Sequence, residues 1–121
     1  MPLVLAGRLP DQVRQALVQR LDAHLTDYGA ATEPPTSPSY DSDGYWRGPI
    51  WAPSTALLES GLRESGHVDQ ADSLRMRFQA LCERSGFAEN FDALSGEGLR
   101  DRAYTWTAAV YLTFCASAAG R

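Results

Sequence analysis

Near the start of the chain, hydrophobic residues recur with the period of an α-helix. Apolar side chains stand at every fourth position, with polar residues between them; they are Val13, Leu17, Leu21 and Leu25. This spacing is typical of an amphipathic helix with one face toward a core. Pro10 suits the first helical turn, where a missing N–H costs nothing. The pattern predicts a helix over residues 10–25.

The helical period disappears between residues 27 and 44. Pro34, Pro35 and Pro38 lie there among small polar residues, a composition that excludes a regular element. A structureless loop of more than about 12–15 residues in a compact domain is usually functional or disordered. Because this loop leads directly into a cluster of aromatic residues, we expect it to be functional.

Two further helices are predicted over residues 54–65 and 68–85. Ser54 is placed to cap the first, and Gly66 and Gly86 are placed to end them. The apolar side chains of each segment share one face; they are Leu58 and Leu62 in the first, and Ala71, Leu74, Phe78 and Leu81 in the second. The second helix is therefore expected to be amphipathic and to lie on the outside.

The last apolar segment, residues 103–119, carries no charge and is apolar or small nearly all round. Such a composition is typical of a helix that is packed on several sides. No segment shows the alternation of a strand, so the chain is predicted to be all-α, built from αα-hairpins. Three neighbouring helices of this size cannot easily cover the last one, which indicates packing partners outside this chain.

Composition narrows the class of protein. The chain has 121 residues, 44% of them hydrophobic, which fits one globular domain or a piece of one. With 11 Lys and Arg against 15 Asp and Glu, the net charge of −4 argues against a nucleic-acid partner. No window is apolar enough for a membrane span, and the first seven residues lack the pattern of a secretory signal. We therefore expect a cytoplasmic protein that acts without a membrane.

The thiols and imidazoles do not form a reactive or metal-binding pattern. Cys82 and Cys115 lie on separate apolar segments without metal-ligand spacing, and burial as small hydrophobic residues is the simplest interpretation. His24 and His67 stand apart from any cluster of ligands and are interpreted as structural. The sequence therefore predicts neither a metal site nor a cofactor.

Aromatic residues are concentrated around the three tryptophans, Trp46, Trp51 and Trp106. Aromatic faces stack on the apolar faces of sugar rings, while Arg, Asp and Glu bind the hydroxyl groups at the rim. Sugar is therefore the natural ligand class. The alternative is that these tryptophans are core residues at the starts of helices.

Glu89 is the carboxylate that stands out, because it follows the predicted end of a helix at Gly86 and lies between Phe87 and Phe91. A carboxylate against apolar rings binds protons more readily and can act as a general base. The alternative for Glu89 is an exposed turn carboxylate. Several other acids fall on polar helix faces and are interpreted as solvated; they are Glu59, Glu64, Asp69, Asp72 and Glu83.

Several strings together resemble a known family. They are Tyr45-Trp46-Arg47-Gly48-Pro49-Ile50-Trp51, Ser85-Gly86-Phe87-Ala88-Glu89-Asn90-Phe91-Asp92, Gly96-Glu97-Gly98, Tyr104-Thr105-Trp106-Thr107-Ala108-Ala109 and the opening Pro2-Leu3-Val4-Leu5-Ala6-Gly7. In this order they are similar to the C-terminal part of (α/α)6-barrel glycosidases, namely the mannosylglycerate hydrolase-like and trehalase-like enzymes of the glycoside hydrolase family 63 group. The resemblance runs from about residue 2 to residue 115.

The resemblance implies a partial glycosidase catalytic domain over residues 1–121 that forms the C-terminal part of an (α/α)6 toroid of six helical hairpins. It implies inverting hydrolysis of an α-glycoside, in which Glu89 matches the general base. The sugar-pocket positions it implies are Tyr45, Trp46, Arg47, Gly48, Trp51 and Trp106. The expected partners are a carbohydrate substrate and either the N-terminal portion of such an enzyme or a second copy of the chain.

One part of the family pattern does not match. The family's general acid is an Asp in an upstream segment rich in Trp, Ser and Gly, and neither Asp41 nor Asp43 matches it. We therefore expect this chain to be inactive alone, because an inverting site needs both carboxylates. The alternative function is a helical module that binds a carbohydrate or a protein without catalysis.

Overall fold

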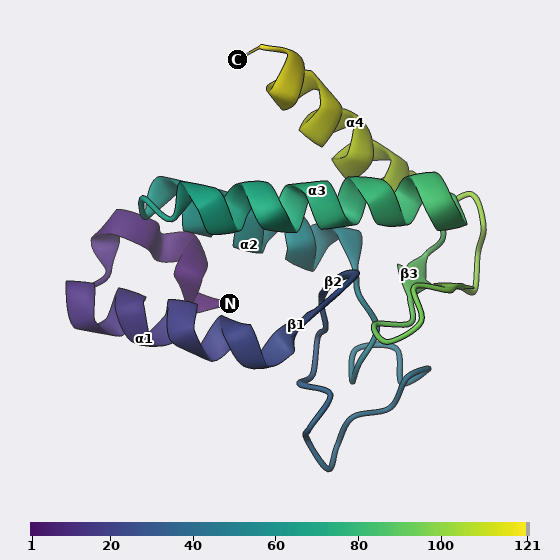
Figure 1. Cartoon of the computed structure of the whole chain (residues 1–121), viewed down its shortest axis with the longest axis horizontal. Helices are drawn as coiled ribbons and strands as arrows, with labels where there is room; N and C mark the ends of the chain where they lie inside the picture. The colour runs from purple at the N-terminus through teal and green to yellow at the C-terminus, as the bar shows by residue number, and fades with distance from the viewer. Residues whose placement is uncertain (121) are drawn as a thin grey trace.

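Two long helices joined by a tight turn form the centre of the structure. In the computed structural model, which describes residues 1–120, α2 (Ala52–Glu64) and α3 (Val68–Ser85) run antiparallel and side by side (Figure 1). The turn passes through Gly66, whose φ of 86° lies in the left-handed region that glycine adopts without strain. The bounds of α3 confirm the helix predicted over residues 68–85.

Helix α2 begins at Ala52, two residues earlier than expected. Pro53 lies in its first turn, where proline is favoured because the first N–H groups of a helix have no intrahelical partner. Trp51 is the N-cap residue and makes no side-chain capping hydrogen bond. The prediction that Ser54 caps the helix is wrong, since its hydroxyl lies within the first turn and donates to the Trp51 carbonyl at 3.1 Å.

The N-terminal segment folds beside this hairpin as short elements. They are the 3-10 helix η1 (Pro2–Arg8), α1 (Asp11–Leu21), the 3-10 turn η2 (Asp22–His24), and the antiparallel strands β1 (Leu25–Thr26) and β2 (Gly29–Ala30). Helix α1 therefore ends four residues before the predicted end, because Leu25 pairs with Ala30. Its buried residues are Val18 and Leu21, whereas Val13, expected on the buried stripe, is 45% exposed.

A second small ribbon follows α3, and it was not predicted from the sequence. Strands β3 (Asn90–Phe91) and β4 (Gly98–Leu99) pair antiparallel and are too short to show an alternating pattern. Helix α4 (Thr105–Ala119) then begins two residues later than expected and packs on α2 and α3. The prevalence of helix confirms the all-α prediction, with these ribbons as the addition.

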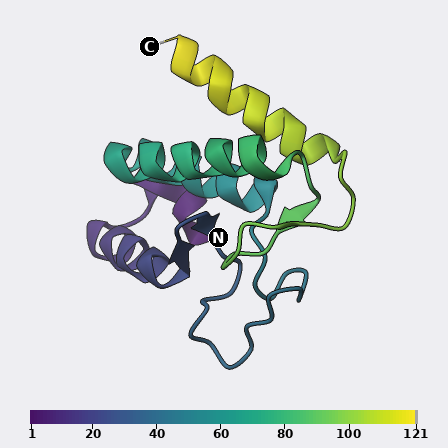
Figure 2. The same cartoon turned by 45° about the vertical axis from the view of Figure 1, so that its right-hand side comes forward.

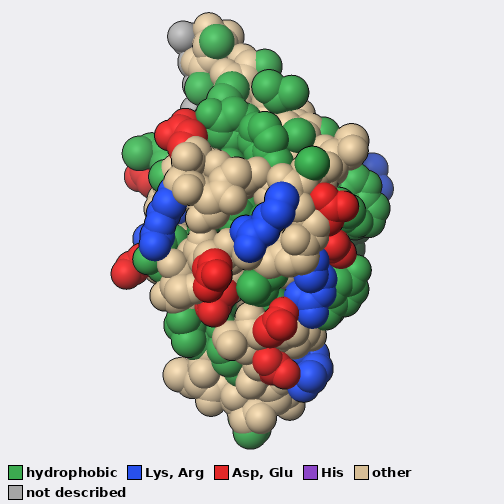
Figure 3. Space-filling model, turned by 90° about the vertical axis from the view of Figure 1, so that its right-hand side faces the viewer, with side chains coloured by type: hydrophobic (Ala, Val, Ile, Leu, Met, Phe, Trp, Pro, Cys, Tyr) green, Lys and Arg blue, Asp and Glu red, His purple; other side chains and the backbone are tan. Residues whose placement is uncertain are grey.

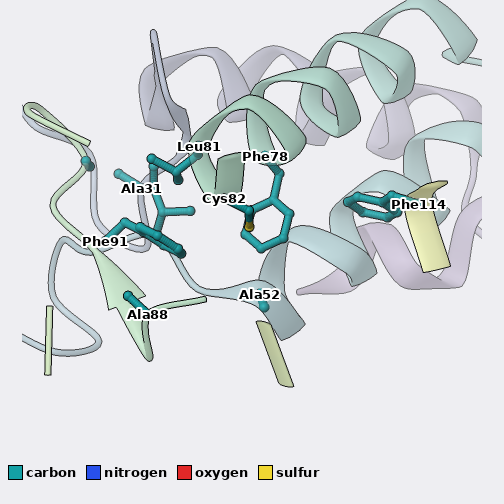
Figure 4. Close-up of a cluster of buried hydrophobic side chains, with 10 residues drawn as sticks. Ala31, Ala52, Phe78, Leu81, Cys82, Ala88, Phe91 and Phe114 are labelled. Carbon is teal, nitrogen blue, oxygen red and sulfur yellow. The ribbon is translucent and has the colours of Figure 1, made fainter. Parts of the chain in front are cut away.

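The hydrophobic core has two parts on opposite ends of the α2–α3 hairpin. One part centres on Phe78, whose ring meets Phe91 and Phe114 edge to face at centroid distances of 6.2 and 6.0 Å (Figure 4). The other lies under η1 and α1; its buried members are Leu3, Val18, Leu21, Ala30, Leu62, Ala71 and Leu74. The first part joins α3, α4 and β3, so it also supports the segment that carries Glu89.

Helix α4 is largely exposed in this chain, although its composition is typical of a helix that is packed on several sides. Only Thr107 and Phe114 of its described residues are buried, and Trp106 and Leu112 are 53% and 63% exposed. Its C-terminal half projects away from α3 (Figures 1 and 2), and Figure 3 shows hydrophobic side chains gathered over it. Helices α2 and α3 pack on α4 and leave most of its surface uncovered, which agrees with the expectation that three neighbouring helices of this size cannot easily cover it. No helix within residues 1–120 is long and apolar enough to cross a membrane.

A buried ion pair connects α2 to α3. Glu59 Oε1 accepts hydrogen bonds from Arg75 Nη2 at 2.5 Å and from Arg63 Nε and Nη2 at 2.9 and 2.7 Å. Glu59 is 5% exposed and Arg75 is 6% exposed, so the prediction that Glu59 lies on a solvated helix face is wrong. The Arg75 guanidinium also lies 5.2 Å from the Phe114 ring, which brings α4 into the same contact.

The two thiols lie in different environments. Cys82 is 3% exposed in the core, and burial raises the pKa of its thiol to about 12, so the prediction of a buried structural cysteine holds for Cys82. Cys115 is only half-buried, and its sulfur accepts a hydrogen bond from Gln79 Nε2 at 3.3 Å. Both are free thiols.

The ion pair predicts a large effect of Glu59→Gln on stability. The substitution leaves the Arg75 charge buried without its counter-charge, and we expect the free energy of unfolding to fall by about 3–5 kcal/mol. Urea denaturation followed by circular dichroism measures this change. Glu64→Gln, on the exposed side of the same helix, is the matched control and should shift stability by less than about 0.5 kcal/mol. Equal effects of the two substitutions would contradict the role given to Glu59.

The Cys82 thiol predicts a loss of stability at alkaline pH. The folded state keeps the thiol neutral up to a pKa of about 12, whereas in the unfolded chain it ionises above a pH of about 8.5. The stability that the neutral thiol contributes to the folded state is therefore complete below a pH of about 8.5. It is lost as pH rises toward 12, by up to about 1.4 kcal/mol per pH unit. Denaturation series from neutral to alkaline pH should show a shallower decline in Cys82→Ala than in the parent chain. Parallel declines would count against the shifted thiol.

Candidate active site

The candidate site forms where two segments far apart in sequence pair through their backbones. Ile50 and Phe91 exchange two hydrogen bonds, N to O at 2.8 Å and O to N at 3.0 Å. This bridge places the segment of residues 45–51 beside strand β3. The Glu89 N–H donates to the Asp101 carbonyl at 2.7 Å, which fixes the backbone of Glu89 on its other side.

The Tyr45 hydroxyl donates a hydrogen bond to Glu89 Oε1 at 3.0 Å. This contact joins the predicted general base to the first residue of the aromatic string. The hydrogen bond to the carboxylate raises the pKa of Tyr45 above the ordinary tyrosine value, because loss of the phenol proton would place two negative charges together. The phenol therefore remains a hydrogen-bond donor to Glu89.

The backbone of Tyr45 adopts an unusual conformation. Its φ of 63° lies in the left-handed region, which costs a non-glycine residue about 1 kcal/mol or more. The Tyr45 carbonyl accepts a hydrogen bond from Trp51 Nε1 at 2.8 Å, and the Trp51 ring meets the Tyr45 ring edge to face at 4.7 Å. These contacts hold the strained residue in place.

Trp46 and Trp51 form a stacked pair whose members have different roles. Their ring centroids lie 4.0 Å apart with an interplanar angle of 11°. Trp51 is 1% exposed, so the interpretation as a core residue is correct for it, whereas Trp46 is 47% exposed. Trp51 therefore supports Trp46 from within, and Trp46 presents aromatic surface to solvent.

Arg47 and Gly48 hold the loop that precedes the site. The Arg47 carbonyl accepts a hydrogen bond from the Asp41 N–H at 2.8 Å, and the Arg47 guanidinium lies 3.4 Å from the Asp41 carboxylate. The Asp41 carbonyl passes so close to Gly48 that a Cβ there would overlap it. The Gly48 N–H donates to Thr32 Oγ1 at 3.1 Å. The loop of residues 27–44 is thus tied down at its exit.

Trp106 lies apart from the stacked pair, at the first turn of α4. Its ring contacts Tyr104 at a centroid distance of 5.7 Å. Tyr104 is also one of the groups whose charge raises the pKa of Tyr45. The Thr107 hydroxyl donates to the Ala88 carbonyl at 2.6 Å, which anchors this end of α4 next to Glu89.

Two residues at the site were missed by the sequence analysis. Arg100 lies with its guanidinium carbon 5.0 Å from the Tyr45 ring centroid, and its Nη1 donates to Asp43 Oδ1 at 2.6 Å. Asp43 was considered only as a general acid and set aside. The two residues are 57 positions apart and share no motif, so no signal in the sequence joins them.

The side chains that could bind a metal ion are dispersed in the structure. Within residues 1–120, no group of three or more His, Cys, Asp or Glu side chains is placed to hold a metal ion. His24 Nδ1 instead lies 2.9 Å from the Ala31 carbonyl, a contact that links η2 to the residue after β2.

A cavity of about 480 Å³ lies between η1, α1 and α2. Its walls are mainly apolar, and Trp46 lines it together with Leu3, Leu17 and Leu58. Glu89 does not line this cavity. Trp46 therefore contributes to this cavity, whereas Glu89 lies outside it.

Comparisons with known proteins identify the family of this chain. Residues 1–107 match the family described as mannosylglycerate hydrolase MGH1-like glycoside hydrolase domain. Mannosylglycerate hydrolase of Rubrobacter radiotolerans is 37% identical over 118 residues, which cover 91% of this chain and 26% of the relative. Glucosylglycerate hydrolase of Mycolicibacterium hassiacum is 30% identical over 116 residues, which cover 90% of this chain and 26% of that protein.

A solved structure of the same family has a similar fold. The GH63 mannosylglycerate hydrolase of Thermus thermophilus in complex with glucose superposes with a TM-score of 0.81 at 32% identity, covering 93% of this chain and 29% of that one. This confirms the predicted fold class, a mainly helical portion of the GH63 fold. The chain spans about a quarter of the length of the curated relatives it matches. It belongs to the family of mannosylglycerate hydrolase MGH1-like glycoside hydrolase domains.

Proposed function

We propose that this chain supplies the general base and part of the sugar pocket for the inverting hydrolysis of an α-linked glycoside of glycerate. The observation that carries the proposal is the Tyr45–Glu89 hydrogen bond of 3.0 Å beside the exposed ring of Trp46. A fixed carboxylate next to an open aromatic surface suits one half of a sugar-hydrolysing site, namely the base and a stacking surface for the sugar. The relatives named mannosylglycerate and glucosylglycerate hydrolase support this substrate class.

In this proposal Glu89 takes a proton from the attacking water. The Tyr45 hydroxyl occupies Oε1, so Oε2 is the oxygen that we assign to the water. The backbone hydrogen bond from Glu89 to Asp101 and the anchor of Thr107 on Ala88 limit movement of this segment. A base that is fixed in this way needs little reorganisation at the moment of reaction.

The sugar would lie against the aromatic residues. Trp46 offers its exposed ring for stacking, and Trp51 supports it from the core side. Arg47 and Gly48 shape the loop edge, and Trp106 forms the wall on the side of α4. These residues carry the pocket role that the resemblance implies.

Catalysis also requires a general acid from another segment of polypeptide. The two carboxylates of an inverting site lie about 6.5–9.5 Å apart, with the acid across the bond that is cleaved. We propose that the remaining helices of an (α/α)6 toroid bring this acid and cover the uncharged surface of α4. The 121-residue chain alone would then be inactive, and the proposed partner is the N-terminal portion of such an enzyme.

A complementation experiment tests the role of Glu89. The chain would be combined with the N-terminal three quarters of the Rubrobacter radiotolerans relative, and release of glycerate from mannosylglycerate and glucosylglycerate would be measured. We expect hydrolysis with the parent chain and a loss of about 10²–10⁴-fold in kcat with Glu89→Gln, since the amide cannot accept the proton. NMR of the freshly released sugar should show the inverted anomer.

Glu97→Gln is the matched control, because Glu97 is an exposed carboxylate in the neighbouring turn. We expect its rate to equal that of the parent chain. A Glu89→Gln complex that binds the N-terminal portion and keeps the full rate would show that Glu89 is not the base. A complex that retains the configuration of the sugar would contradict the inverting mechanism.

A further inference from the structure

Arg100 and Asp43 form a two-point contact between the loop after β4 and the loop before Tyr45. Arg100 Nη1 donates to Asp43 Oδ1 at 2.6 Å, and Nη2 donates to the Asp43 carbonyl at 3.2 Å. The fork of a guanidinium makes such a pair of bonds in one orientation, which a lysine ammonium cannot reproduce. The contact therefore fixes the position of one loop relative to the other.

The residues on both sides of this contact have strained backbones. Tyr45 has a φ of 63° and Arg100 has a φ of 62°, and neither is a glycine. Such conformations persist only where the surrounding structure determines them strongly. The contact joins Arg100, one strained residue, to Asp43, which lies two residues before Tyr45, the other.

The Tyr45 ring is held from more than one direction. The Arg100 guanidinium carbon lies 5.0 Å from its centroid, and the Trp51 ring meets it edge to face at 4.7 Å. The Tyr45 carbonyl accepts a hydrogen bond from Trp51 Nε1 at 2.8 Å. With ring and backbone fixed, the hydroxyl is directed to Glu89 Oε1 at 3.0 Å.

We propose that Arg100 and Asp43 are positioning residues, a clamp that holds the Tyr45 hydroxyl on Glu89 and thereby orients the carboxylate. The proposal rests on the proposed function, because it assigns a purpose to the orientation of Glu89. Neither residue is required to touch the substrate. The clamp acts on Glu89 entirely through Tyr45.

Titration of Tyr45 separates a positioning role from a simple charge effect. The hydrogen bond to Glu89 raises the pKa of Tyr45, whereas the nearby positive charge of Arg100 lowers it. If Arg100 is a clamp, its removal releases the phenol from Glu89, and the pKa falls toward the ordinary value of a tyrosine. If Arg100 acts only through its charge, its removal makes the pKa rise.

The experiment uses the 121-residue chain without a partner. The ultraviolet absorbance of the phenolate is followed against pH, and Tyr45→Phe identifies the contribution of Tyr45 among the five tyrosines. We expect Arg100→Gln and Asp43→Ala to lower the pKa of Tyr45, as Glu89→Gln should by removing the carboxylate charge. Asp43→Ala removes the side-chain acceptor of Arg100 but keeps the arginine charge, and so serves as the second test of the clamp.

Arg84→Gln is the matched control. The Arg84 guanidinium carbon lies 5.0 Å from the Tyr28 ring centroid, the same kind of contact at another place in the fold. This variant should leave the titration of Tyr45 unchanged. A rise or no change in the pKa of Tyr45 in Arg100→Gln would overturn the clamp, and so would an unchanged value in Asp43→Ala.

The activity of the complemented enzyme distinguishes this proposal from the one on which it rests. If the clamp orients the base, Arg100→Gln should lower kcat at least tenfold with little change in KM. An unchanged phenol titration in Arg100→Gln, together with an inactive Glu89→Gln, would overturn the clamp and leave the general base in place. A fully active Glu89→Gln with a shifted titration in Arg100→Gln would overturn the proposed function instead.

Discussion

The backbone bridge between Ile50 and Phe91 is the contact on which the rest of the site depends. It joins the start of α2 to the ribbon after α3, and both residues are completely buried. Phe91 packs against Phe78 of α3, so the bridge is attached to the hydrophobic core. Without this pairing, the hydrogen bond from Tyr45 to Glu89 would have no fixed geometry, because the two residues lie 44 positions apart.

The sequence predicted the elements whose signals are local. Helix α3 was placed correctly because its apolar period lies within the segment and Gly86, with a φ of 76°, directly follows its last residue. Ser54 was misjudged as a cap because Pro53 allows the helix to begin earlier. The burial of Glu59 could not be predicted, since its partner Arg75 lies on a different helix.

The candidate site was predicted only as far as sequence motifs reach. The family resemblance singled out Tyr45 and Glu89, and the structure brings them into contact. The tryptophans could not be told apart from composition, because only packing decides that Trp51 is buried and Trp46 is not. Arg100 escaped detection for a related reason: its bond to Asp43 depends on two loops that the fold brings together.

The two ends of α4 show how an ordered site can coexist with an uncovered apolar surface. At its first turn, Thr107 is fully buried and bonds to the carbonyl of Ala88, the residue before Glu89. Farther along, Phe114 is the last buried side chain, held between Phe78 and Arg75. Beyond it the helix projects from the fold (Figure 2). Because both buried side chains of α4, Thr107 and Phe114, lie before the projecting end, a partner that covers this end leaves the base in place.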